Sequence, residues 1–425
     1  MTARLARLAG LLVLVAATPL AAQAPTATSH ETAADSSPAA STGPELRLAP
    51  RPTLRVGDVF KLSLTARVQA DIHAPDQPVD ELGVDVARRR VGVTGTLTKH
   101  LEFEVERELE DGGAWRDVFV NVRTVRSAQV RAGRFKMPFS LDQLTGAGSL
   151  DFVSRSRAAD LLAPGRSTGV SVHGRLTRHV LGYDAGVFTH DGDVARFGSN
   201  PGGGTTVAGR VTVRPRGAAR RSGSLADVEF GLNATRGEVP EGRYSLRGRL
   251  TSKDVFFSPV FVQGRRLRVG GDLDWRPGPF GVRAEYLRAD DARHDQGLMG
   301  ETLPAVRADG WYVSGVWAVA GRRRHAEADN RLAFAGLDGL ELTARVERLT
   351  FGTGGEAGSV VRTPRAVELP AVSDRVWTFG ANWTFNRLVR LQLNAVREQV
   401  VDHARGAAPA SGGSWSPVAR VQIAM

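Results

Sequence analysis

The chain has 425 residues, a formal net charge of +11 and no cysteine. The lack of cysteine excludes a disulfide-stapled scaffold, a cysteine nucleophile and a cysteine-ligated metal centre. After residue 24, no apolar run approaches the roughly 18 residues of a membrane-spanning helix, so a helical membrane protein is excluded as well.

The first 24 residues predict a secretory signal peptide. Arg4 and Arg7 precede an apolar stretch at 8–17, and the segment ends on an A-x-A site at 22–24. The apolar stretch is much shorter than the roughly 20 residues of a spanning helix, which makes a membrane anchor the weaker alternative. We therefore expect an exported protein.

Residues 25–53 are rich in Pro, Ser and Ala and have no periodicity, which predicts a disordered leader. The folded domain is then expected at 54–425. An exported domain of this size without disulfides needs another source of stability. A closed sheet in which every backbone group is paired provides one.

Residues 60–72 alternate strictly, with an apolar side chain at every even position. A period of two indicates a strand with one apolar and one polar face. This strand exceeds the usual length of about 5–6 residues in soluble sheets and suits a tilted membrane strand of about 9–11. The pattern recurs at 90–98, 100–109, 118–122, 128–134, 170–176, 181–187, 207–213, 228–234, 267–275, 280–286, 311–319, 340–346, 377–385, 389–395 and 418–425. These segments predict an all-β fold, a transmembrane antiparallel β-barrel of about 16 strands. Residues 244–257 are a doubtful further strand, which we assign to a loop.

The connections between the predicted strands alternate in length. Short ones lie at 99–100, 178–179, 277–279 and 386–387, and long ones at 73–83, 237–264 and 352–374. Short periplasmic turns and long external loops are typical of outer-membrane barrels. Two Arg-rich connections at 215–224 and 321–339 break this rule. They could bind nucleic acid or acidic lipid, but solvated basic turns are the favoured interpretation, so no nucleic-acid partner is predicted.

Aromatic residues lie mostly near the ends of the predicted strands on the apolar face, where they would form a girdle at the membrane boundary. A soluble sandwich core could also use such residues, which is the alternative interpretation. They are Trp275, Tyr286, Trp311, Trp377, Trp383 and Phe385.

The polar face of the predicted barrel is rich in both Arg and Glu, which implies a water-filled lumen. Arginines there would attract anions, whereas the glutamates at 102, 104, 106 and 108 would repel them. Alternatively, the two kinds of charge simply pair across strands. The chain contains no recognisable catalytic motif, and the HDGD segment at 190–193 has the composition of an ordinary turn. We therefore predict a protein that is not an enzyme, with no cofactor and no metal site.

The alternation stops between Gly133 and Arg166, where the chain has much apolar content. Such a segment would be an aggregation hazard in water, so we predict an inward-folded constriction loop at about 136–166. The polar side chains that it would bring to the narrowest point are Lys136, Asp142, Gln143, Arg155, Arg157 and Arg166.

At these residues the chain resembles the phosphate-selective porins O and P of Gram-negative outer membranes. The resemblance lies in GRFKMPFSLDQL (133–144), SRSRAADLLAPGRSTGV (154–170), ARRRVGVTGTL (87–97), GPFGVRAEY (278–286), GLELTARVERL (339–349) and FGANWTFNRLVRLQLN (379–394). It implies a sixteen-stranded, usually trimeric barrel whose Arg and Lys side chains take up phosphate or polyphosphate. This chain has only four lysines, so arginine would have to substitute, and it ends in Met425 rather than the Phe common to such barrels. By analogy, the candidate anion-binding and pore residues are Arg88, Arg89, Arg90, Lys136, Arg155, Arg157 and Arg166.

The predicted function is a passive outer-membrane channel for small anions, with phosphate or polyphosphate as the expected substrate. The alternatives are a general non-selective porin, a barrel that acts as a surface receptor or structural anchor, and, least favoured, an outer-membrane enzyme. The expected partners are small anions, outer-membrane lipid and two further copies of the chain.

Overall fold

The computed structural model describes residues 44–48, 51–73, 83–110, 113–177, 180–192, 204–215, 228–251, 254–320, 339–353, 365, 369, 371–402 and 414–425. The chain divides into two units, Met1–Ser41 and Thr42–Met425, and the description concerns the second. The predicted signal peptide, most of the predicted leader and most of the two Arg-rich connections lie outside the described residues.

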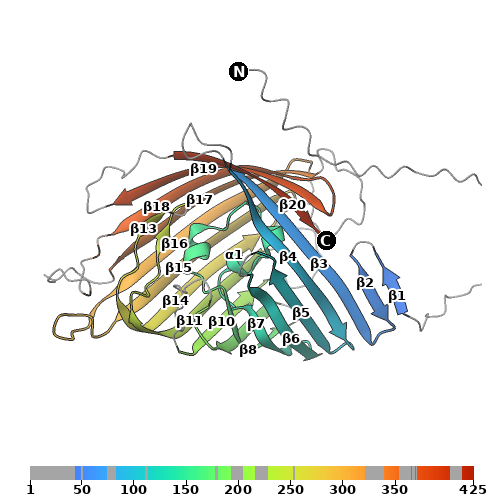
Figure 1. Cartoon of the computed structure of the whole chain (residues 1–425), viewed down its shortest axis with the longest axis horizontal. Helices are drawn as coiled ribbons and strands as arrows, with labels where there is room; N and C mark the ends of the chain where they lie inside the picture. The colour runs from blue at the N-terminus through green and yellow to red at the C-terminus, as the bar shows by residue number, and fades with distance from the viewer. Residues whose placement is uncertain are drawn as a thin grey trace, which may run out of the picture. The chain divides into compact units, whose positions relative to one another are not determined.

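The second unit is built on an 18-stranded sheet, of which β1 and β2 form a hairpin and the other 16 strands form a closed antiparallel barrel. Pairing between the last strand and β3 closes the barrel, with Val418 opposite His73 and Ala424 opposite Arg67 (Figure 1). The predicted fold is therefore confirmed. The barrel strands are β3 (Phe60–His73), β4 (Gly83–Leu97), β5 (Leu101–Glu108), β6 (Trp115–Val125), β7 (Ala128–Lys136), β8 (Arg166–Leu176), β9 (Leu181–Phe188), β10 (Thr206–Val213), β11 (Val228–Gly242), β14 (Val262–Trp275), β15 (Phe280–Arg293), β16 (Leu303–Ala318), β17 (Leu340–Thr353), β18 (Val372–Thr384), β19 (Val389–Asp402) and β20 (Ser414–Ala424).

A hairpin of β1 (Pro44–Arg47) and β2 (Thr53–Val56) precedes the barrel. β20 pairs with β3 from Arg67 onwards, and Met425 adds two backbone hydrogen bonds to Ala66. β2 pairs with the remaining edge at 60–63. The hairpin thus supplies hydrogen-bond partners for backbone groups that barrel closure leaves open. The described sheet starts at Pro44, ahead of the predicted domain boundary at 54.

The two faces of the barrel wall are reversed relative to a soluble sheet. Leu232 is 72% exposed on the outer face, whereas the next residue, Asn233, is 6% exposed on the inner face. Apolar side chains outward and polar side chains inward are what a wall between lipid and a polar lumen requires. The alternation read from the sequence predicted these orientations correctly.

The segment between β7 and β8 folds into the lumen, as predicted, and we refer to residues 137–165 as the constriction loop. It contains α1 (Leu141–Leu144), the 3-10 turn η2 (Ala147–Ser149) and α2 (Arg157–Leu162). Ser140 and Ser156 cap the two helices, because each hydroxyl accepts a backbone N–H three residues on, at 3.2 Å. Neither described helix is long and apolar enough to cross a membrane.

A second segment between β11 and β14, described at 243–251 and 254–261, also packs inside the barrel. It carries the two-stranded sheet of β12 (Gly248–Arg249) and β13 (Val255–Phe257), which is separate from the barrel sheet. Residues 244–257 therefore add no strand to the barrel, as their assignment to a loop predicted. Its inward fold was not predicted. Leu246 and Phe257 join Leu161 and Leu162 of the constriction loop in one buried cluster against the inner faces of β15, β16 and β17. Burial of these apolar side chains fixes both loops to the same side of the barrel.

Candidate functional site

The constriction loop is fixed to the wall formed by β15 to β20. The Glu285 carboxylate on β15 accepts the backbone N–H groups of Leu141 at 2.8 Å and Asp142 at 3.3 Å. Glu347 on β17 accepts the backbone N–H of Arg157 at 2.5 Å. These carboxylates meet the N-terminal turns of α1 and α2, where free N–H groups favour negative charge.

The same wall also donates to the loop's carbonyl oxygens. The donors include Arg345 to Ser154, Asn382 to Asp151, Arg390 to Leu150, Gln392 to Leu150 and Arg420 to Val153, at 2.5–3.1 Å. Arginines that the sequence places in the lumen on β17, β19 and β20 are therefore occupied with holding the loop. A pocket between the loop and the wall on this side, lined by Phe152, Arg283 and Arg345 among others, has a volume of only about 10 Å³.

The open space lies on the other side of the loop, against the wall of β3 to β9. A cavity of about 880 Å³ is bounded there by that wall and by the loop residues Gln143 and Arg155. Its nine basic lining residues are Arg67, Arg88, Arg90, Arg116, Arg131, Arg134, Lys136, Arg155 and Arg166. Its five acidic lining residues are Glu104, Glu106, Asp117, Asp160 and Asp184. The lining thus carries four more basic than acidic groups, and we call it the basic cavity.

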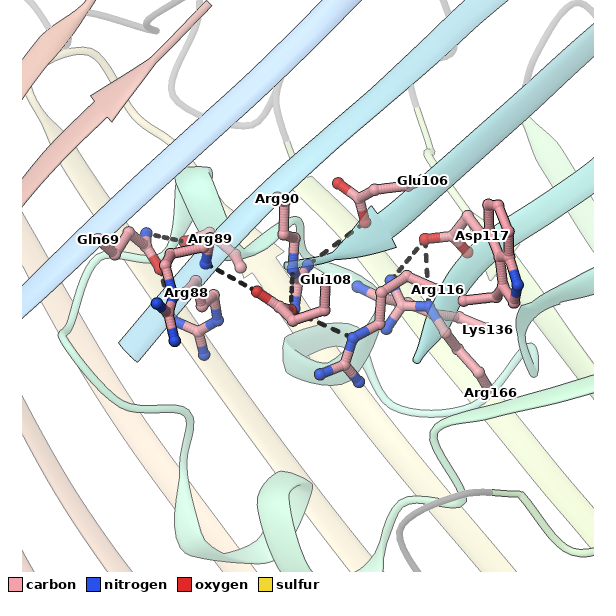
Figure 2. A network of polar contacts seen from close by, with 12 residues as sticks. Gln69, Arg88, Arg89, Arg90, Glu106, Glu108, Arg116, Asp117, Lys136 and Arg166 are labelled. Carbon is pink, nitrogen blue, oxygen red and sulfur yellow. Dashed lines mark hydrogen bonds and ion pairs between the residues drawn. The ribbon is translucent and has the colours of Figure 1, made fainter. Parts of the chain in front are cut away.

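Several of these cations are neutralised by carboxylates (Figure 2). Arg90 pairs with Glu108 at 2.6 Å and with Glu106 at 3.4 Å, and Arg116 also reaches Glu108, at 3.3 Å. Arg166 donates twice to Asp117, at 2.5 and 3.1 Å. The cross-strand pairing considered from the sequence therefore holds for part of the glutamate row.

Three other arginines of the basic cavity have no carboxylate partner among the described residues. Arg88 donates only to the side-chain oxygen of Gln69, at 2.5 Å. Arg131 lies over the rings of Phe119 and Phe135 at 5.1 and 5.2 Å. Arg67 makes no hydrogen bond to a described residue, and its Nε is buried. Sequence reasoning did not select Arg67 or Arg131 as site residues, although both lie on the inward parity of their strands.

Two candidate residues line the basic cavity but are tied to the constriction loop. The ammonium of Lys136 donates to the carbonyl oxygens of Gln143, Leu144 and Thr145 at 2.7, 3.2 and 3.1 Å. An ammonium has three hydrogens, so these bonds use them all at the end of α1. Arg155 donates to the carbonyl oxygens of Asp142 and Thr145. Burial, followed by the nearby Arg166 and Arg90, lowers the pKa of Arg155, although Asp142 and Asp160 oppose the shift.

The structure corrects two candidate residues. Arg89 lies on the outer face of β4, opposite Val68, because its neighbours Arg88 and Arg90 point inward and side chains alternate along a strand. Arg157 is buried on the far side of the loop, where it pairs with Asp374 at 3.4 Å and Glu398 at 3.8 Å. Neither residue faces the basic cavity. The candidates that line it are Arg88, Arg90, Lys136, Arg155 and Arg166.

A second cavity of about 670 Å³ lies nearer the short turns of β5 to β10. Its basic lining residues are Lys99, Arg123, Arg126, Arg175 and Arg210, and its acidic ones are Glu102 and Asp184. Asp184 on β9 lines both cavities. Together the two cavities follow one side of the lumen from the constriction loop towards the short turns.

The HDGD segment at 190–193 has a structural role in its described part. Asp191 accepts from Arg266 at 2.7 Å and from Arg268 at 2.5 and 2.9 Å, and both arginines are fully buried on β14. Burial opposes ionisation of Asp191, but Arg268 and Arg266 outweigh it and hold its pKa below the usual value. Within the described part of the chain, no group of three or more His, Asp or Glu side chains is placed to hold a metal ion.

The family assignment agrees with this geometry. The sequence model of the phosphate-selective porin O and P family matches residues 62–414. The chain belongs to this family. The match covers most of the barrel, including the constriction loop and every residue of the basic cavity. The porin is a multi-pass β-barrel channel of the outer membrane, and its family and fold are typical of non-enzymatic channels.

Solved structures support the fold of this porin. OmpT of Vibrio cholerae, folded in vitro, superposes with a TM-score of 0.56 at 11% identity over 87% of this chain and 98% of that one. The channel DcaP of Acinetobacter baumannii gives 0.55 at 10% identity over 86% and 98%. OmpF of Salmonella typhi, in complex with daunomycin, gives 0.51 at 10% identity over 87% and 98%. A comparison with curated protein sequences finds no match.

Proposed function

We propose that this porin conducts small anions in preference to cations, with phosphate or polyphosphate as the favoured class. The observation that carries the proposal is the basic cavity, the large open space beside the constriction loop, in which Arg67, Arg88 and Arg131 have no carboxylate partner among the described residues. The family's description points to the same substrate class.

Guanidinium groups suit this task because each offers a planar fork of donors that matches two oxygens of a phosphate. Arg88 and Arg67 lie on neighbouring strands, and Arg131 faces the same cavity from β7. An anion can exchange part of its hydration shell for these donors, one after another. Each contact then binds it strongly enough to draw it into the pore and weakly enough to release it. Lys136 and Arg155 contribute charge, but their donors position the constriction loop.

A general non-selective porin is the second candidate function, because Glu104, Asp160 and Asp184 also line the basic cavity without an ion pair to a described residue. If these carboxylates are ionised, they offset part of the arginine field. The two candidates differ in the sign and size of ion selectivity.

Reversal potentials in planar bilayers under a salt gradient test the proposal. We expect anion preference, and a chloride current that millimolar phosphate reduces. The double variant Arg67→Gln/Arg131→Gln should lose most of the phosphate effect. Arg307→Gln serves as the matched control, because Arg307 lies on the outer face and is paired with Asp290 at 2.8 Å. Cation preference, or a phosphate effect that survives in the double variant, would contradict the proposal. A lumen sealed to ions would instead support a receptor or anchor.

We propose further that the porin is a homotrimer. The support is the trimer form recorded for OmpT of Vibrio cholerae, which shares the fold. Chemical cross-linking of the protein in outer-membrane vesicles should give a ladder that ends at three subunits. A ladder that ends at one or two subunits would contradict the trimer.

A further inference from the structure

Arginines lie on the outer face of the barrel near the long-loop ends of several strands. On β15 and β16 they are neutralised, because Arg288 and Arg307 both pair with Asp290 at 2.8 Å. Strands β17 to β20 and β3 to β6 form the other half of the circumference. In their described residues, no acidic side chain occupies a position that faces outward. The outward arginines there have no protein carboxylate on their own strands.

The densest group on that half consists of Arg348 on β17, Arg375 on β18 and Arg397 on β19, which we call the outer arginine patch. Arg348 and Arg375 lie directly opposite each other on the adjacent strands β17 and β18. Arg397 follows diagonally, because its own register partner is Trp377, two residues beyond Arg375. Like charges directly opposite on one face of a sheet are destabilising unless an anion lies between them.

The outer arginine patch also contains an unsatisfied donor. The Nε of Arg348 is buried and has no hydrogen-bond partner among the described residues. The outward carboxylate of Asp309 on β16 lies opposite Thr350 rather than Arg348. Arg348 is the first of three arginines whose charges act on Asp309, and it shares this carboxylate with Arg288 and Arg307. None of the three patch arginines forms an ion pair with a described carboxylate.

The patch lies where a membrane headgroup would be. Below it, the outward residues of β17 are Leu340, Leu342, Ala344 and Val346. The distance from Leu340 to Arg348 is about 26 Å along the strand at roughly 3.3 Å per residue, and less along the membrane normal because strands tilt. With a strand tilt of roughly 35–45° the separation is about 20 Å along the membrane normal, which places the patch near the edge of an apolar band of about 25 Å.

Tryptophans border the patch on both sides. Trp311 lies opposite Arg348, Trp377 lies opposite Arg397, and the Arg397 guanidinium is 5.9 Å from the ring centre of Trp415. Trp415 is 56% exposed. Indole rings prefer the headgroup boundary, where one part of the ring contacts acyl chains and the N–H contacts polar groups.

We propose that the outer arginine patch binds the phosphate of an anionic lipid in the outer leaflet, with Arg348 and Arg375 on either side of the phosphate and Arg397 beside it. The acyl chains lie along the outward apolar residues of β17 and β19. The half without outward acidic residues continues beyond the β20–β3 pairing, with Arg89 on β4 and Arg107 on β5. The Arg107 guanidinium is 5.1 Å from the ring centre of Trp115. This inference concerns the outer wall and does not depend on anion conduction through the lumen.

Native mass spectrometry of the purified porin with added phosphatidylglycerol or phosphatidylcholine tests the site, since only the first lipid carries a net negative charge. We expect the wild-type protein to bind phosphatidylglycerol about tenfold more tightly, and Arg348→Gln/Arg375→Gln to lose most of that preference. Arg307→Gln removes one outward charge that is paired with Asp290, and this variant should keep the preference for phosphatidylglycerol. Arg348→Lys/Arg375→Lys retains both charges and should show part of the wild-type preference for phosphatidylglycerol, even if the Gln variant folds poorly.

Equal binding of both lipids by the wild-type protein would overturn the proposal, as would an unchanged preference in the Arg348→Gln/Arg375→Gln variant. If the wild-type protein shows no lipid preference while the double variant loses subunit association, the patch contacts a second copy of the chain and the proposal also fails.

Discussion

Arg67 on β3 and Arg90 on β4 lie directly opposite each other in the barrel wall, yet among the described residues only Arg90 forms ion pairs with carboxylates. The paired arginine stabilises the wall, whereas the unpaired one leaves its charge to the lumen. Two arginines at one register position thus have different expected roles.

Substituting each of these arginines should separate the two roles. Arg67→Gln should reduce anion preference and leave stability almost unchanged, because Arg67 makes no hydrogen bond to a described residue. Arg90→Gln should destabilise the barrel by about 2 kcal/mol or more, since it removes a partner from the buried Glu108. Reversal potentials and urea unfolding in vesicles measure the two effects. Equal loss of selectivity in both variants would contradict this division.

Lys136→Met should change the behaviour of the constriction loop more than the selectivity. The variant loses three hydrogen bonds to the carbonyl oxygens that end α1. Leaving these oxygens without the ammonium costs about 1–3 kcal/mol. We expect noisier single-channel currents and faster proteolysis within 137–165. A shift in reversal potential as large as that of Arg67→Gln would instead mean that Lys136 acts directly on the passing ion.

Glu285→Ala should loosen the loop from the β15 wall. The Glu285 side chain accepts two backbone N–H groups, and leaving a buried donor without its partner costs about 1–3 kcal/mol. We expect a larger or more variable single-channel conductance. Glu229→Ala is a suitable control, because Glu229 lies inward on β11 and pairs with Arg214 rather than with the constriction loop. Identical conductance of the Glu285 variant and the wild-type channel would show that the apolar cluster alone holds the loop.

Asp191→Asn should destabilise the barrel in a pH-dependent way. Arg268 and Arg266 hold the pKa of Asp191 below its usual value, so its contribution is fully present above about pH 4 and is lost as pH falls through the lowered pKa. At pH 7 the loss should be about 3 kcal/mol, because two buried arginines lose a shared partner. Thermal unfolding of both proteins from pH 7 to pH 3 checks this. A difference that stays constant down to pH 3 would exclude ionised Asp191 as its source.

Asp184→Asn should strengthen anion preference. Asp184 lines both cavities, and one of its carboxylate oxygens is buried without a hydrogen-bond partner among the described residues. Removing its charge takes a repulsive group from the point where an anion passes from one cavity to the other. The reversal potential should shift towards that of an ideal anion channel. Asp117→Asn, which removes a carboxylate already paired with Arg166, should shift it less.

The amino-acid sequence by itself determined the barrel, the approximate strand number and the position of the constriction loop. A period of two assigns each side chain to one face whatever strand lies beside it, so residues 60–72 alone revealed an apolar outer face. The broken alternation after Gly133 located the loop for the same reason. The parity rule also excludes Arg89 from the lumen, although the resemblance to the family had suggested it.

Only the tertiary structure decided which arginines remain available to an ion. Pairing depends on register and on barrel closure, which bring together residues as distant in sequence as Asp71 and Arg420. The inward fold of 243–261 and the attachment of the constriction loop to Glu285 and Glu347 likewise follow from contacts across the lumen. Alternation tells which residues face inward, but the free charge of Arg67 and Arg131 depends on which carboxylates the closed barrel places beside them.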